Sequence, residues 1–249
     1  MTHRISMLGA LLPALFLAPA AAGEPEAFTD GFRLEDCTFQ DKGRNAYFSL
    51  NPGDQLVFEG EDEEETLLLQ ITVLQDRQWV SFETPGGDAL QVRTRVVEER
   101  EWVDDALVEV SRNFFALCEE TGDVFYFGEE VDIYEDGEIV SHDGAWRAGV
   151  EGALPGLIAP GRFLLGARYF QEVAPGVALD RAENVAMGLT VETEAGTFED
   201  CVEVLETTPL QPGSESTKVY CPGIGLVQDD EATLVEADIQ ETKARRARQ

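Results

Sequence analysis

Carboxylates are by far the most abundant groups in this sequence that could do chemistry, whereas histidine is almost absent. The chain has 49 Asp and Glu against 18 Lys and Arg, a formal charge of −31, and two His, His3 and His142. A zinc or copper site built on several imidazoles therefore cannot form within one chain. No GxSxG motif is present to supply a serine nucleophile.

Paired carboxylates can hydrolyse glycosides, so the acidic residues raise the question of an enzyme. Among so many acids, however, spacing alone singles out no catalytic pair. The sequence thus predicts a protein that is not an enzyme, and a carboxylate-based hydrolase is the alternative.

One acidic segment has part of the spacing of a calcium-binding loop. Asp132, Asp136 and Asp143 fit its first, fifth and twelfth positions, with Gly137 at the sixth. Tyr134 occupies a ligand position and the flanks look like strands, so an Asp136-Gly137 hairpin turn is the preferred interpretation. We expect no cofactor, and the alternative function is a Ca²⁺-dependent acidic envelope or matrix protein.

A second acidic run covers residues 59–65 between two strand-like segments. Clustered carboxylates of this kind can hold Ca²⁺ through oxygen ligands. Contiguous residues on a strand alternate faces, however, and a charged hairpin tip hinders edge-to-edge aggregation. The run is therefore interpreted as a solvated hairpin tip.

The acidic charge also excludes classes of partner. Nucleic acids and anionic membrane surfaces are polyanions that need a basic footprint, which this chain lacks. After the N-terminal region, no apolar run is long enough to cross a bilayer as a helix. We predict no nucleic-acid binding and no membrane span.

The N-terminus has the three regions of a secretory signal peptide. Arg4 is followed by a short apolar stretch over residues 7–19 and then by Ala20, Ala21 and Ala22, so cleavage is expected before Gly23. We therefore predict a signal peptide over residues 1–22, a single β-rich domain over 23–241 and a basic flexible tail over 242–249. The protein is expected to be periplasmic or extracellular.

The four cysteines suit an exported protein. Their even number indicates two disulfides, for which three connectivities exist. Cys201 and Cys221 are symmetric about residue 211 within a Pro/Gly-containing turn, so they face each other across a predicted hairpin. Cys37–Cys118 follows by elimination.

Apolar and polar residues alternate with period two through much of the chain, which is the signature of strands. Turn signals containing Pro, Gly, Asp or Asn separate these segments. Residues 144–162 are rich in Gly and Pro and indicate a long loop, and residues 178–187 fit a helix face as well as a strand. The pattern predicts an all-β or mainly β fold with an antiparallel, strongly curved sheet, a half-barrel or a sandwich. The expected strands cover 45–50, 55–60, 66–75, 77–83, 89–102, 105–119, 123–135, 138–142, 163–173, 186–194, 197–208, 216–222, 224–229 and 232–239.

Several strings carry a resemblance to known proteins. The strings AYFSLNPGDQLVFEGEDEEET (46–66), EAGTFEDCVEV (194–204) and KVYCPGIGLVQ (218–228) contain a YFxLxPG…FEG segment, an AGTF turn and a PGxGLV hairpin. With residues 123–160, they resemble exported bacterial β-rich proteins of unknown function. The resemblance implies a strongly curved antiparallel sheet, similar to periplasmic lipoprotein carriers, and it implies no catalytic residues.

Aromatic residues provide the last expectation. Adjacent aromatics on a strand point to opposite faces, so a sheet with one buried face places some of them on a second, ligand-facing surface. The aromatics assigned to that surface are Phe114, Phe125, Phe127, Trp146 and Tyr169. We expect an exported β-domain that binds an apolar or amphipathic ligand, or a protein partner, on its concave face.

Overall fold

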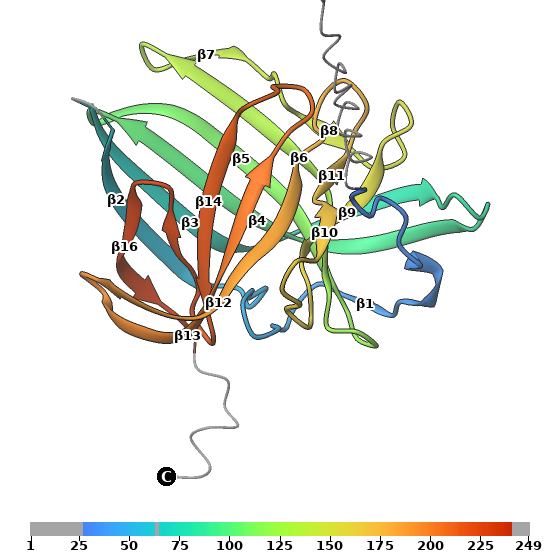
Figure 1. Cartoon of the computed structure of the whole chain (residues 1–249). Coiled ribbons are helices and arrows are strands. Elements are labelled where there is room, and N and C mark those ends of the chain that lie inside the picture. Colours follow the sequence, from blue (N-terminus) through green and yellow to red (C-terminus); the bar gives the residue numbers. More distant parts are fainter. Residues whose placement is uncertain (1–26, 63–64, 241–249) are drawn as a thin grey trace, which may run out of the picture.

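The computed structural model describes residues 27–62 and 65–240, and it is almost entirely antiparallel β-structure (Figure 1). The predicted signal peptide and the predicted basic tail lie outside these residues. Apart from a 3-10 turn, η1 (Leu34–Asp36), every described element is a strand. The all-β prediction is therefore confirmed.

The described residues form sixteen strands. Their bounds are β1 (Phe39–Gln40), β2 (Gln55–Asp62), β3 (Glu65–Glu83), β4 (Ala89–Val103), β5 (Ala106–Cys118), β6 (Val124–Glu135), β7 (Glu138–Ser141), β8 (Trp146–Arg147), β9 (Leu154–Ala159), β10 (Arg168–Phe170), β11 (Glu172–Val173), β12 (Arg181–Thr193), β13 (Gly196–Thr207), β14 (Glu215–Cys221), β15 (Gly225–Asp229) and β16 (Ala232–Asp238).

The strands form one strongly curved sheet whose two ends come together. Its order is β10-β12-β13-β14-β15-β16-β2-β3-β4-β5-β6-β9-β11, with β1, β7 and β8 on side branches. The terminal strands β10 and β11 are consecutive in the chain and are separated only by Gln171. The sheet therefore bends round until β12–β16 lie opposite β4–β6, and Figure 1 shows this curl.

Three sequence expectations about local structure were wrong or incomplete. Residues 45–50 form an irregular turn, because the Asn45 side-chain oxygen accepts the backbone N–H groups of Tyr47 and Phe48. The expected loop at 144–162 contains β8 and β9. The ambiguous stretch 178–187 begins β12, where ladder pairing to β13 decides in favour of a strand.

A bulge in β3 bends the sheet and is held by a buried arginine. Between Val73 and Arg77 the register against β4 shifts, and the shift leaves carbonyl groups without ladder partners. Arg95 is fully buried, and its Nη1 donates to the carbonyls of Leu74, Gln75 and Asp76 at 2.9–3.3 Å. The bend is therefore built into the β3–β4 pair.

The carboxylate of Asp41 fastens the N-terminal segment to this bend. Asp41 is buried and forms ion pairs with Arg77, Arg93 and Arg95, and Arg95 Nε also donates to the Asp41 carbonyl at 2.7 Å. Burial would raise the pKa of Asp41, but the hydrogen bond from Arg77 and the charges of Arg93 and Arg95 outweigh it and lower the pKa. Asp41 is therefore the counter-ion that makes an arginine cluster tolerable inside the fold.

Both predicted disulfides are formed. Cys37–Cys118 and Cys201–Cys221 have Cα–Cα distances of 5.1 and 4.2 Å. In the β13–β14 ladder Val202 pairs with Tyr220, which puts Cys201 beside Cys221 as the symmetry of the hairpin predicts. The two disulfides fit an oxidising compartment. Within the part of the chain that the structure describes, no helix has the length and apolar character needed to cross a membrane.

Candidate functional site

A cavity of about 250 Å³ lies inside the curve of the sheet. It is bounded by β2–β6 on one side and by β13–β15 on the other. The turn at residues 45–50, strand β9 and residues 171–180 also line it. Its lining residues are Tyr47, Phe48, Ser49, Asp54, Leu56, Ile71, Val73, Val97, Glu99, Glu109, Ser111, Asn113, Phe115, Tyr126, Glu129, Ile158, Gln171, Glu172, Asp180, Glu206, Lys218, Tyr220, Ile224, Gly225, Leu226 and Ile239.

The strand register divides one wall of the cavity into an apolar half and a polar half. One row of neighbouring residues runs from Leu56 through Ile71 and Glu99 to Ser111 on β2–β5. The next runs from Val73 through Val97 and Asn113 to Glu129 on β3–β6. Because residues facing each other in a ladder share a sheet face, both rows change from apolar to polar in the same direction.

The opposite wall carries an ammonium group, that of Lys218. Lys218 Nζ lies 2.6 Å from Asp229 Oδ2 and 3.8 Å from Glu206 Oε2. Burial would lower the pKa of Lys218, but Glu206 and Asp229 outweigh it and raise the pKa well above its ordinary value. Lys218 is therefore a permanent cation that is already paired.

Gln171 and Glu172 lie where strand β10 ends and strand β11 begins, and both line the cavity. Gln171 Nε2 donates to Glu206 Oε1 at 2.6 Å, and Trp146 Nε1 donates to Glu172 Oε1 at 3.3 Å. Gly156 allows β9 to pack closely there, since a Cβ at this position would lie 2.3 Å from the Gln171 carbonyl oxygen. The side-chain oxygen of Gln171 is buried and has no hydrogen-bond partner among the described residues.

A polar network supports the wall formed by β5 and β6. The Tyr126 hydroxyl donates to Asn113 Oδ1, and Asn113 Nδ2 donates to Ser111 Oγ at 3.2 Å. The Tyr126 ring packs against Phe115 and Trp146, with centroid distances of 4.6 and 5.3 Å. These contacts hold the Tyr126 ring in place, and its hydroxyl group interacts with the carboxyl group of Glu129.

Enclosure in the cavity shifts several of its glutamates toward the protonated form. Burial raises the pKa of Glu99 to about 8, although the charge of Lys218 opposes the shift. Burial raises the pKa of Glu129 to about 7, although its interaction with the neighbouring Tyr126 opposes the shift. Burial and the charge of Glu129 hold the pKa of Glu172 well above its ordinary value. These three glutamates therefore keep their protons to a higher pH than exposed glutamates do.

These shifts predict a pH-dependent stability. A carboxyl group with a higher pKa in the folded state keeps a proton that the unfolded chain releases, so the free energy of unfolding falls as pH rises from 4.5 to about 8. Replacing Glu99 by glutamine should raise the free energy of unfolding at pH 8 by on the order of 2 kcal/mol and change it little at about pH 4. Urea unfolding at both pH values measures the effect. Glu138→Gln on the exposed strand β7 is the matched control, and equal stabilisation at both pH values would contradict this explanation.

No protein-family model matches this chain, and neither a curated protein nor a solved structure matches it. The resemblance to exported β-rich proteins therefore stays a prediction. The AGTF and PGxG strings lie at the β12–β13 and β14–β15 turns, where their glycines suit hairpins.

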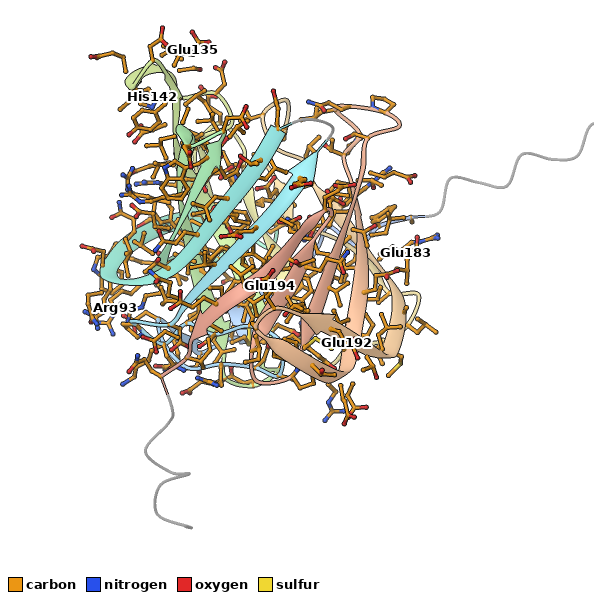
Figure 2. All side chains as sticks on the ribbon, turned by 90° about the vertical axis from the view of Figure 1, so that its left-hand side faces the viewer. Arg93, Glu135, His142, Glu183, Glu192 and Glu194 are labelled. Atoms are coloured by element: carbon orange, nitrogen blue, oxygen red, sulfur yellow. A yellow bond between two sulfur atoms is a disulfide. The ribbon has the colours of Figure 1, made fainter. Side chains whose placement is uncertain are left out.

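The proposed calcium residues are not brought together. Asp136 and Gly137 form the two-residue turn between β6 and β7, with φ values of 51° and 80°, as in a type I′ hairpin. Asp132 pairs instead with Arg112 Nη1 and with His142 Nδ1, each at 3.0 Å. Figure 2 shows His142 and Glu135 at the outer end of this hairpin. Asp132, Asp136 and Asp143 do not approach within ligand distance of one another.

The aromatics expected to face a ligand belong to the core instead. Phe114, Phe125, Phe127, Trp146 and Tyr169 are all at most 6% exposed, and none of them lines the cavity. Phe125 and Phe127, for example, pack against Phe39 of the N-terminal segment. Period two separates the two faces of a strand but does not say which face a later segment will cover. The aromatics on the cavity wall are their neighbours Phe115 and Tyr126, together with Tyr47, Phe48 and Tyr220.

The acids of the cavity were not singled out by the sequence. One signal existed on β4, where Glu99 lies two residues after the buried Val97 and therefore shares its face. Glu206 carried the same signal on β13, where it lies two residues after the buried Val204. Glu172 carried none, because it enters the site only where the ends of the sheet meet. The chain holds too many acids for their positions to be informative without the fold.

Proposed function

We propose that this protein is an exported binding protein, periplasmic or extracellular, that holds a small amphipathic ligand in the cavity of its curved sheet. The observation that carries the proposal is the division of the cavity wall. Ile71, Val73 and Val97 offer an apolar surface, and Glu99 and Glu129 lie at the polar end of the same rows. Binding sites combine apolar surface with a few convergent polar groups in this way.

The size of the cavity limits the ligand. Its volume of about 250 Å³ is below the range of roughly 300–1,000 Å³ that is typical of pockets for drug-sized molecules. A ligand of one ring or one short chain fits this volume better than an acylated protein or a phospholipid. The ligand is therefore expected to be smaller than the cargo of a lipoprotein carrier.

A hydrolytic function has less support. Acid-base catalysis by two carboxyl groups requires environments that push their pKa values apart. Glu99, Glu129 and Glu172 are all shifted upward, mainly by the same cause. The proposal therefore assigns binding and no reaction.

The test is a titration with phenethyl alcohol, a small neutral amphipathic probe, followed by calorimetry. We expect saturable binding to the unmodified protein and its loss in Ile71→Trp, because the larger side chain fills the apolar half of the cavity. Ile71 is only half-buried, so the variant should fold, and Ile71→Phe is a milder second variant. Val140→Trp on the exposed strand β7 is the matched control. If no probe binds, or if the Ile71 variants bind as well as the control, the proposal is wrong.

A further inference from the structure

The cavity carries a large excess of acidic groups, which bears on the charge of its ligand. Among the residues that the structure describes, seven carboxyl groups line it, against the single ammonium group of Lys218. They come from segments far apart in the sequence, including β4, β5, β6, β11 and β13. Lys218 is occupied by Asp229 and Glu206, so it leaves the acids near Glu129 and Glu172 without a cation.

A second and independent observation points to a ligand that donates hydrogen bonds. Gln171 is 3% exposed, lines the cavity and has an unpartnered side-chain oxygen. Its amide nitrogen is held by Glu206, and its backbone N–H donates to the Asp180 carbonyl at 2.7 Å. A buried acceptor without a donor is costly, typically about 1–3 kcal/mol. The oxygen is itself shielded from the cavity, so a bound donor would satisfy it once the Gln171 side chain turns toward the ligand.

An organic cation fits these groups better than a metal ion. Ca²⁺ and Mg²⁺ need several oxygen ligands close together, and in the described part of the chain no three cavity carboxylates come within ligand distance of one another. An alkylammonium group can instead donate to acceptors that are more widely separated, and its apolar body can cover Ile71 and Val97. The rings of Tyr126 and Tyr220 also favour a cation beside them.

We propose, as a deepening of the proposed binding function, that the ligand is a small organic ammonium ion. Its head group lies between Gln171 Oε1 and the carboxylates of Glu129 and Glu172, and its apolar body lies against Ile71, Val73 and Val97. The other charged groups that line the cavity are Asp54 before β2, Glu99 on β4, Glu109 on β5, Asp180 before β12, Glu206 on β13 and Lys218 on β14.

Binding of an ammonium ion to these carboxyl groups should depend on pH. A carboxyl group must release its proton before it can pair with a cation, so binding of the ammonium ion expels protons. Because the pKa of Glu129 is about 7 and that of Glu99 about 8, affinity should rise as pH increases from about 6 to about 8. An aliphatic amine stays protonated throughout this range, since its pKa is about 10.

The experiment compares three probes with the same ring and different head groups. Phenethylamine is the cation, phenethyl alcohol the neutral analogue and phenylpropionate the anion, each titrated by calorimetry at about pH 6 and about pH 8. At the higher pH we expect the amine to bind at least about tenfold more tightly than the alcohol, as one charge-assisted hydrogen bond of about 1.5–3 kcal/mol gives. The anion should bind more weakly than either. The affinity of the amine should rise with pH, and that of the alcohol should not.

Matched variants locate the effect. Glu172→Gln and Glu129→Gln should each lower the affinity for the amine about tenfold and change the affinity for the alcohol by a much smaller factor. Glu138→Gln on β7 should change neither affinity. If the amine and the alcohol bind equally in the wild type and Ile71→Trp still blocks both, the cavity binds ligands but the inference about charge is wrong. If Ca²⁺ alone competes with the amine and loses affinity in the same variants, the site belongs to a metal ion and the inference is overturned.

Discussion

Replacing Asp41 by alanine should lower the free energy of unfolding by about 3–5 kcal/mol at neutral pH, the usual cost of breaking a buried ion pair on one side. Asp41 is 3% exposed and is the counter-ion of Arg77, Arg93 and Arg95, of which Arg95 is completely buried. Without it, Arg95 keeps its charge and its bonds to the bulge carbonyls but loses its acidic partner. Urea unfolding measures the loss.

The pH dependence of this loss has a definite sign. Because the pKa of Asp41 is lowered in the folded state, its contribution is complete above the ordinary value of 3.8 and disappears as pH falls through the folded value. The difference between wild type and variant should therefore shrink in acid. Asp36→Ala is the control, since the ion pair of Asp36 with Arg33 is exposed and should contribute less than about 1 kcal/mol. If both variants lose the same stability, the arginine cluster does not depend on Asp41.

Replacing Lys218 by methionine should destabilise the protein by about 3 kcal/mol at about pH 8 and also increase its affinity for phenethylamine. Methionine keeps the apolar stem but removes the cation that pairs with Asp229 and Glu206. The pKa of Glu206 is already raised by burial, so protonation of its carboxyl group should relieve part of the loss at about pH 5.

The two readouts for Lys218 have opposite signs, which separates electrostatics from misfolding. A variant that was merely misfolded would lose both stability and binding. Lys42→Met is the control, because Lys42 is exposed and does not line the cavity. Unchanged stability, or weaker binding of the amine by a folded Lys218→Met protein, would contradict the assignment of Lys218 as the paired cation of the cavity.

The sequence was a good guide to what depends on neighbouring residues. Alternation predicted the long strands β4, β5 and β6 almost to their ends, and the symmetry of one hairpin predicted Cys201–Cys221. The Asp136-Gly137 turn was likewise predicted from its own two residues. These features are local, so each is determined by a few side chains and a period of two.

Features that depend on the closing of the sheet could not be predicted in the same way. Gln171 and Glu172 enter the cavity because the two terminal strands are consecutive in the chain, and nothing in their own sequence indicates this. Phe114 was predicted to face the ligand, but Phe114 belongs to the core and its neighbour Phe115 lines the cavity. The reason is related. The N-terminal segment covers one side of β6, and this cover decides which aromatics are core and which line the cavity.

A crystal structure of the protein with saturating phenethylamine at about pH 8 tests the central claim most directly. The account predicts one molecule inside the curve of the sheet, with its ring against Ile71, Val73 and Val97. Its nitrogen should lie within hydrogen-bond distance, about 2.7–3.2 Å, of Gln171 Oε1. An empty cavity at a concentration that saturates binding in calorimetry, or an amine whose nitrogen points away from Gln171 and Glu172, would contradict it.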